Sequence, residues 1–508
     1  MKTYSSELLD QVKEILNIGI ALSVEKDHTR ILEMIVTEAR RITAADGGTL
    51  YLRNGDFLTF KIIQTESMHI FKGGQGEPVD LPPVPMAKAN VSSYVALTNK
   101  SVNIPDVYQA EGFDFSGPMK YDQITGYRTV SMLVIPLENH VREVIGVLQL
   151  INARNENGDL IPFAPYFEKV ISSLASQAAI SLTNNQLLAD IERLLNSFVE
   201  VMATAIDSRT PYNANHTRRV ALLAGELARA IDKSSDGIWA NEVFSDERIT
   251  QLVMAGWLHD VGKIATPLSV MNKATRLEGR IELVLQRLDY IYSSLKAKYL
   301  DKKLAMFIEK NEDELPQLEK EWSEQQARVD DARELIIKVD NPATFVDKDI
   351  LKTLQEIAAF TYFDPSGREY PWLSASELTA LSVVKGTLTE EERRIMEDHV
   401  IITQRMLAKI PFTGKLKQVP YFAGIHHEHL NGNGYPLGLK GEDIPLEGRI
   451  LALVDVFDAL TASDRPYKKE MPLEQALKIL GFMVKDGELD GDLLDIFSRS
   501  KVWEQIED

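Results

Sequence analysis

Histidines and aspartates recur in separate apolar helical stretches of the second half of the chain. His259-Asp260 ends one such stretch, ITQLVMAGWLHD, and His426-His427 ends another before a glycine-rich loop. Burying an imidazole or a carboxylate is costly unless it is paired or bound to a metal. His399 lies within a further helical stretch, Asp455 interrupts an apolar run, and His216 follows the turn-like TPYNAN. The candidate ligands are therefore His216, His259, Asp260, His399, His426, His427 and Asp455. A helical bundle builds metal sites in its core from such side chains, so the pattern predicts a metal site.

These candidate ligands exceed the number that one ion uses, which favours two ions lying a few Å apart. Paired ions suit in-line displacement at phosphorus, because they stabilise both the attacking and the leaving oxygen. The chain has no cysteine, so nitrogen and oxygen atoms must hold the metal. Such ligands suit iron, manganese, nickel, zinc or cobalt. The predicted reaction class is therefore metal-dependent phosphoester hydrolysis.

The composition indicates a multidomain globular protein without membrane spans. A chain of 508 residues, 44% hydrophobic and 26% charged, is too long for a single core. No window reaches the roughly 18 apolar residues of a membrane span, and the N-terminal sequence lacks the apolar core of a signal peptide. We therefore expect a cytoplasmic location and no membrane partner. The net charge of −19 repels phosphate backbones, so polymeric nucleic acid is not an expected partner.

The first segment combines a helical pattern over about residues 5–45 with several short strand patterns, which predicts an α+β domain. The runs SVNIPDVY and SMLVIPLENHVREVIGVLQLINARNENGDLIPF resemble a GAF domain over about residues 20–180. The resemblance implies an antiparallel sheet with helices that senses a small molecule. GAF domains that bind cyclic nucleotides commonly carry an Asn-Lys and an Asp-Glu pair, whereas this chain has Asn152-Ala153 and Phe167-Glu168. The ligand stays unknown, and a dimerisation scaffold is the alternative role.

A stretch without glycine or proline, residues 170–206, predicts one long helix. Its apolar residues follow the alternating four and three spacing of a coiled-coil seam. The seam residues are Leu187, Ile191, Leu194, Phe198, Val201 and Ala205. We expect this helix to join two copies of the chain and to carry motion from the sensor to the following domain. An ordinary amphipathic helix is the alternative.

After Asp207 the pattern is helical almost throughout, which predicts an all-α bundle. A charged stretch and an aromatic one, FDPSGREYPWL, mark an insertion at about 277–385. A solvated helical hairpin is the simplest interpretation, but we expect its aromatic residues Phe363, Tyr370 and Trp372 to cover the entrance to the metal site. The expected domains are a sensor over 1–180, a linker helix over 181–206 and the bundle over 207–508.

The sequence HDVGK at 259–263 resembles the HD-x-G-K core of the HD phosphohydrolases. His426-His427-Glu428, the run GNGYPLGLKG at 432–441 and DVFDALTASDRPYKK at 455–469 resemble the HD-GYP subfamily, the cyclic di-GMP phosphodiesterases. Together these motifs cover about residues 195–275 and 386–485. The resemblance implies an HD-GYP bundle in the second half of the chain.

Carried over to this sequence, the resemblance implies that all seven candidate ligands bind metal and that Asp260 bridges two ions. It implies a catalytic role for Asp260 and for Lys263, which would lie beside the scissile phosphate. The implied substrate contacts are Tyr435, Gly434, Arg465 and Lys468. Iron or manganese is the metal favoured by the resemblance. Glu428 has two open interpretations, a partner that orients a histidine or an exposed charge.

Two positions depart from the family pattern. Family members with three metals commonly place a Glu four residues before the first histidine, where this chain has Tyr212, so we expect two ions. Many members also carry an Asp six residues before that histidine, where this chain has Thr210. That departure puts one contact to substrate or ligand in doubt.

The function that these resemblances imply is hydrolysis of cyclic di-GMP to pGpG, with further cleavage to GMP open, under control of the GAF sensor. Two alternatives remain. The chain is a cyclic di-GMP receptor with little turnover, or its substrate is a hybrid cyclic GMP-AMP. The motifs do not settle base selectivity, the sensor ligand or the direction of regulation.

Overall fold

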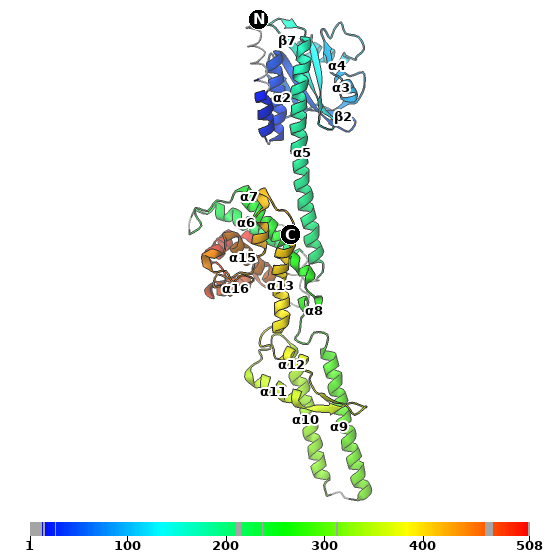
Figure 1. The fold of residues 1–508 in the computed structure, drawn as a ribbon, viewed down its shortest axis with the longest axis vertical. Coiled ribbons are helices and arrows are strands. Elements are labelled where there is room, and N and C mark those ends of the chain that lie inside the picture. Colours follow the sequence, from blue (N-terminus) through cyan, green and yellow to red (C-terminus); the bar gives the residue numbers. More distant parts are fainter. Residues whose placement is uncertain are drawn as a thin grey trace. The chain divides into compact units, whose positions relative to one another are not determined.

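The structure, a computed structural model, describes residues 13, 16–25, 27–209, 215–235, 237–310, 313–462 and 471–505. The chain divides into two compact units, Met1–Leu195 and Asn196–Asp508. Figure 1 shows the helices and strands of each unit along the chain. Among the described residues, no helix combines the length and the apolar character that crossing a membrane requires.

The first unit is built on an antiparallel sheet with the strand order β3-β2-β1-β7-β6-β5, in which β4 also pairs with β2 and β8 with β7. The strands are β1 Ala45–Asn54, β2 Phe57–Thr65, β3 Ile70–Lys72, β4 Val84–Pro85, β5 Val102–Ile104, β6 Met132–Glu138, β7 Val144–Arg154 and β8 Leu160–Ile161. The helices around them are α2 His28–Thr43, α3 Val91–Thr98, α4 Ser116–Thr125 and the start of α5 Pro165–Asp207. The expected α+β sensor fold is confirmed.

Alternation along β7 divides this unit into two cores. Leu148 and Leu150 belong to the core that contains residues of α2 and α5, such as Ile35 and Leu174. Val147 belongs to the core on the other face, which contains residues of α3. Side chains of a strand alternate between the two faces of a sheet, so the sheet lies between two helical layers.

Helix α5 runs over 43 residues as one continuous helix (Figure 1). Leu174 is fully buried in the first unit, and Val199, Ala203 and Ile206 are buried in the second. Between these stretches, the large apolar side chains of the predicted seam are 47–72% exposed. An exposed apolar stripe on a long helix is typical of a helix that pairs with a partner.

In the described part of the second unit, the regular elements are helices and one short hairpin. Its helices outside the insertion are α6 His216–Asp232, α7 Asp246–Leu258, η1 Val261–Ala265, α8 Leu268–Met271, α13 Glu390–Leu407, η2 Gly414–Leu416, α14 Val419–Ala423, η3 Gly441–Asp443, α15 Leu446–Thr461, α16 Leu473–Lys485, α17 Gly491–Arg499 and η4 Val502–Glu504. The predicted helical bundle with a helical insertion is confirmed.

The insertion has a core of its own. It contains α9 Ile281–Glu309, α10 Leu315–Asp340, α11 Lys348–Ala359, β9 Thr361–Phe363, β10 Glu369–Pro371 and α12 Ala375–Leu381. Leu288, Ile336 and Leu354 are fully buried in its apolar cluster. Figure 1 shows α9 and α10 side by side. The segment is therefore a small packed subdomain, which is more than the solvated hairpin predicted from its charge.

The aromatic residues of the insertion pack within it. The Trp372 side chain is 4% exposed in the insertion core, where its ring centroid lies 5.1 Å from that of Phe360. The Tyr370 ring lies 5.9 Å from that of Tyr362, and the Phe363 carbonyl accepts a hydrogen bond from Tyr290. Trp372 is buried in the insertion core and does not cover the metal site. The Phe363 and Tyr370 side chains are 49% and 40% exposed, and a covering role for these two stays a prediction.

A buried arginine fastens the ends of the insertion to each other. The Arg276 guanidinium is fully buried and donates hydrogen bonds to the carbonyls of Asn341 and Thr344, both at 2.7 Å, and of Val383 at 2.9 Å.

We predict that Arg276→Met destabilises the insertion by on the order of 3 kcal/mol, because several buried carbonyls lose their donor. Hydrogen exchange of α9 and α10 measures this change. The control is Arg333→Met, which removes a surface ion pair with Asp289 and should cost less than about 1 kcal/mol. Equal exchange rates in both variants would contradict the role of Arg276.

Candidate metal centre

The predicted ligands come from separate elements and meet in one cluster. His259 and Asp260 follow the last residue of α7, and His399 lies inside α13. His426 and His427 follow α14. The remaining members are His216, the first residue of α6, and Asp455 in α15. The structure therefore brings all seven predicted side chains together from five parts of the chain.

Asp260 lies at the centre of this cluster. Its Oδ2 atom is 3.2 Å from Nε2 of His259 and 3.5 Å from Nε2 of His216. Its Oδ1 atom is 3.3 Å from Nε2 of His399 and 4.0 Å from Nε2 of His426. Each oxygen of this carboxylate thus faces a different pair of imidazoles, which is the arrangement that a carboxylate shared by two ions requires.

Asp455 also spans the cluster. Its Oδ1 atom lies 3.2 Å from Nε2 of His216, and its Oδ2 atom lies 3.9 Å from Nδ1 of His427. The ligand atoms of His216, His259 and Asp260 all lie within 4.8 Å of one another, as do those of His399, His426 and His427. These are two groups that can each hold an ion.

Hydrogen bonds fix the orientation of the imidazoles. Nδ1 of His259 lies 2.7 Å from the Gly256 carbonyl, and Nδ1 of His399 lies 2.6 Å from the Met396 carbonyl. Nδ1 of His426 is 2.8 Å from the Ala423 carbonyl, again three residues earlier. A carbonyl can only accept, so Nδ1 carries the proton and Nε2 presents a lone pair to the cluster.

Several buried polar atoms of the cluster have no hydrogen-bond partner in the described part of the chain, and this supports metal binding by these residues. Nε2 of His259, His399 and His426 and Oδ1 of Asp260 are buried without a hydrogen-bond partner among the described residues. Buried polar atoms in proteins are nearly always satisfied. Four such atoms converging on one place need a common partner, and a divalent cation is the partner that lone pairs of nitrogen and oxygen share.

The charges in the cluster reinforce this assignment. Although burial opposes ionisation, His259 and Lys263 hold the pKa of Asp260 well below its usual range. Burial also opposes protonation of His259, but Asp260 raises the pKa of that imidazole to about 9, so a metal ion would have to displace a proton from its Nε2 atom. Burial lowers the pKa of His427 to about 3 and, with the neighbouring His427, lowers that of His426 far below its ordinary value. The carboxylate is ionised and the His426-His427 pair is neutral, which are the states that ligate metals.

The other predicted site residues fall into two sets. Nζ of Lys263 lies 2.5 Å from Oδ2 of Asp260, and the Tyr435 ring centroid lies 4.8 Å from that of His427. A Cβ atom on Gly434 would lie 2.3 Å from the backbone nitrogen of His429, so this position of the loop needs glycine. The predicted positions Arg465, Lys468, Thr210 and Tyr212 lie outside the described residues.

Glu428 does not orient a histidine and is not an exposed charge. Its side chain is buried, with Oε1 accepting from the Leu437 amide at 2.6 Å and Oε2 from the Leu439 amide at 2.8 Å. Both interpretations from the sequence are therefore wrong. The carboxylate anchors the loop that carries Tyr435 beside the cluster, and only the folded loop reveals its two amide partners.

Sequence reasoning missed two supporting residues. Oδ2 of Asp458 lies 2.7 Å from Nδ1 of His216, and the same carboxylate pairs with Arg219. The Thr403 hydroxyl accepts from the Gly262 amide at 2.9 Å and donates to the His259 carbonyl at 3.1 Å. Both follow a ligand at helical spacing, Asp458 three residues after Asp455 and Thr403 four after His399. That spacing on one helix face is the signal that could have found them.

The comparisons with known families agree with this architecture. A family model described as GAF domain matches residues 27–182, and two models described as HD domain match 213–355 and 375–493. The chain thus contains a GAF domain in its first part, followed by a region that matches HD domains. The resemblances to a GAF domain and to an HD domain are confirmed, and the HD-GYP kind is the one that the motifs indicate.

Similar proteins include two curated phosphodiesterases. One is the 3'3'-cGAMP-specific phosphodiesterase 3 of Vibrio cholerae serotype O1, 44% identical over 96 residues that make up 19% of this chain and 20% of that protein. Another is the cyclic di-GMP phosphodiesterase of Thermotoga maritima, 44% identical over 93 residues, 18% of this chain and 25% of that protein. The chain spans only a fifth to a quarter of these relatives. Among solved structures, the GAF domain of an Acinetobacter phosphoenolpyruvate-protein phosphotransferase is 15% identical with a TM-score of 0.27, covering 35% of this chain and 97% of that one.

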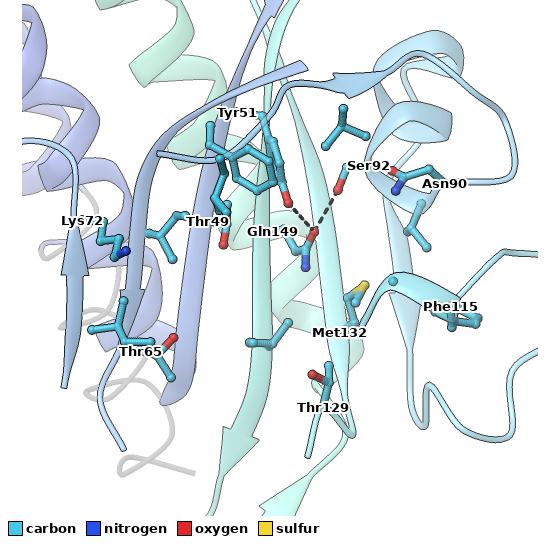
Figure 2. A pocket seen from close by; sticks show the side chains of 18 of the residues that line it. Thr49, Tyr51, Thr65, Lys72, Asn90, Ser92, Phe115, Thr129, Met132 and Gln149 are labelled. Carbon is cyan, nitrogen blue, oxygen red and sulfur yellow. Dashed lines mark hydrogen bonds between the residues drawn. The ribbon is translucent and has the colours of Figure 1, made fainter. Parts of the chain in front are cut away.

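The GAF domain contains a second candidate site, a cavity of about 410 Å³ (Figure 2). Oε1 of Gln149 accepts hydrogen bonds from the Ser92 hydroxyl at 2.8 Å and the Tyr51 hydroxyl at 3.3 Å, which leaves the amide nitrogen of Gln149 to face the cavity. Lys72 lines the same cavity and forms no ion pair within the described part of the chain. Most other lining residues are apolar. The cavity therefore suits a small, largely apolar molecule with hydrogen-bond acceptors.

Gly262 of the HDVGK motif is needed for close packing on α13. A Cβ atom there would lie 2.0 Å from the His399 carbonyl oxygen and 2.6 Å from the Thr403 nitrogen. We predict that Gly262→Ala separates η1 from α13, costs about 1–3 kcal/mol in stability and lowers the bound metal, because His399 moves away from Asp260. Thermal unfolding and elemental analysis measure both effects.

The matched control is Gly481→Ala in α16, where an added Cβ meets nothing within 4 Å. This variant should keep its metal and its stability. Full metal content and unchanged unfolding in Gly262→Ala would contradict the packing role.

Proposed function

We propose that this chain is a metal-dependent phosphodiesterase that hydrolyses cyclic di-GMP to pGpG. The observation that carries the proposal is Asp260, whose two oxygens face two separate groups of imidazoles. The names of the relatives support phosphodiester chemistry. The proposed organisation is a GAF sensor over 1–180, a linker helix over 181–206 and an HD-GYP domain over 207–508 with the insertion at about 277–385.

Two divalent ions, iron or manganese, are the proposed cofactors. His216, His259 and Asp455 would hold one ion, and His399, His426 and His427 the other, with Asp260 between them. When bound, such ions neutralise charge on the phosphate and lower the pKa of water, which supplies the nucleophile. The absence of a carboxylate at position 212 supports two ions rather than three.

The protein's own residues supply the remaining requirements. The Lys263 ammonium lies against Asp260 and is positioned to offset the negative charge that grows on the phosphate. The Tyr435 ring packs on His427 at the edge of the cluster, where it offers a stacking surface for a guanine. Gly434 keeps that loop close to the His427 carbonyl. Arg465 and Lys468 are the proposed phosphate contacts farther along the chain.

Two alternatives to this function remain open, a different substrate and a receptor role. A hybrid cyclic GMP-AMP is a competing substrate because a relative named for that nucleotide is as similar as the one named for cyclic di-GMP. A receptor with little turnover is the second alternative. The full set of seven ligands supports catalysis instead, since nucleotide binding alone needs no such cluster.

The sensor and the linker complete the proposal. The GAF domain binds a small molecule in the cavity around Gln149 and Lys72 and thereby regulates the HD-GYP domain. A second copy of the chain covers the exposed seam of α5, where Leu194 is 72% exposed, and forms a homodimer. The location proposed for this signalling protein is the cytoplasm.

Mass spectrometry of products tests the proposal. The metal-loaded chain is incubated with cyclic di-GMP and, separately, with the hybrid cyclic GMP-AMP. We expect pGpG from the first substrate, with GMP appearing only if a second cleavage follows. Faster conversion of the hybrid supports that alternative substrate, and binding without any product supports the receptor.

Substitutions of Lys263 and of Asp260 should differ in their effects on the reaction rate and on metal binding. We predict that Asp260→Ala loses both activity and metal, because one carboxylate serves both groups of imidazoles. Lys263→Ala should keep its metal and raise the barrier by about 2.7–4 kcal/mol, the usual effect of losing one contact to transition-state charge. Steady-state kinetics with elemental analysis checks both variants.

Lys233→Ala is the control, since this lysine is exposed at the end of α6. It should behave like the unchanged chain. Normal turnover in Lys263→Ala would reject the role given to its ammonium group.

A further inference from the structure

We infer that the end of α5 positions the metal centre through two residues, Asp207 and Arg209, which makes them positioning residues for the reaction. This inference rests on the proposed function. Each residue reaches a different ligand-bearing segment, one at the start of α6 and one in η1.

Asp207 caps the helix that begins with His216. The residue before this helix, Asn215, has φ 66° and makes no side-chain capping bond. Asp207 takes over this task, because Oδ2 accepts from the Thr217 amide at 3.2 Å and Oδ1 from the Thr217 hydroxyl at 2.7 Å. Both side chains are buried. A carboxylate at a helix N-terminus satisfies a free amide and complements the helix dipole, so it fixes the first turn and with it His216.

Arg209 holds the short helix that carries Lys263. Its guanidinium donates to the Lys263 carbonyl at 3.0 Å and also to the Ile264 carbonyl. The Lys263 side chain leaves the same residue and reaches Asp260. A shift of the guanidinium therefore shifts the backbone from which the ammonium group is aimed.

The helix that presents both residues is anchored on either side of its exposed seam. In the second unit Val199, Ala203 and Ile206 are buried just before Asp207, and in the first unit Ile171 and Leu174 of the same helix are buried in the GAF core. After its first residue, Pro165, this continuous helix contains no glycine or proline that would kink it. Displacement or rotation of α5 by the sensor would thus reach His216 through Asp207 and Lys263 through Arg209.

The two contacts should have different consequences. Arg209→Ala should lower kcat by about 10- to 100-fold with KM and metal content unchanged, because misplacing a catalytic group by about 1 Å has effects of this size. Arg209→Lys should recover part of the loss. Asp207→Ala should weaken Mn²⁺ binding by about 10- to 100-fold, as losing a residue that orients a metal ligand does. Asp207→Asn, which keeps an acceptor oxygen, should recover part of that affinity.

A double-mutant cycle separates positioning from a merely structural role. If Arg209 acts through Lys263, adding Arg209→Ala to Lys263→Ala causes no further loss of kcat. Arg193→Ala, which removes an exposed ion pair with Asp190 on the same helix, is the control and should leave kcat unchanged. An additive loss in the cycle, or an unchanged kcat in Arg209→Ala, would overturn the role of Arg209.

The readouts also distinguish this inference from the proposed function. The cycle is run with cyclic di-GMP and with bis(p-nitrophenyl) phosphate, a simple phosphodiester. Lack of turnover on both contradicts the phosphodiesterase proposal and, with it, the role of Arg209. Mn²⁺ titration needs no turnover, so Asp207→Ala still tests the coupling of α5 to His216. Unchanged Mn²⁺ affinity in that variant would overturn the inference for Asp207.

Discussion

The structure of the second unit depends on one buried carboxylate, that of Asp260. It is placed where α7 ends, and each of its oxygens faces its own pair of imidazoles within 4.0 Å. A charge buried this deeply is tolerated only with opposite charge beside it, and the Lys263 ammonium group provides it. The close approach of η1 to α13 at Gly262 follows from the same requirement, because His399 must reach Asp260 across that contact.

A hydrogen bond within the local helical turn orients three of the five clustered histidines. His259, His399 and His426 each direct Nδ1 to the carbonyl three residues earlier, so their own helical turns fix the tautomer. His216 and His427 are the exceptions, and His216 begins a helix and therefore has no preceding turn. Its Nδ1 atom is held by Asp458, and its helix is held by Asp207. Of these two ligands, His216 is the one whose helix contacts the end of α5, and the inferred positioning role of Asp207 rests on that contact.

The sequence predicted the parts of the fold and site that local patterns encode. Helix α5, the GAF sheet and the seven clustered side chains follow from periodicity and from motifs, and the structure contains them. The sequence could not predict contacts between distant residues, such as the Asp207 cap on α6 or Glu428 on the loop of Tyr435. The core of the insertion was missed for a related reason, since its charged surface hides the apolar positions of α9 and α10.

We propose that Asp260 lies between two ions in the metal-loaded protein. Anomalous X-ray diffraction from crystals of the manganese-loaded chain, measured at the manganese absorption edge, tests it directly. We expect two anomalous peaks per chain, one next to Oδ2 of Asp260 with His216 and His259, and one next to Oδ1 with His399 and His426. A single peak, a third peak of equal height, or peaks that leave Asp260 uncoordinated would contradict it.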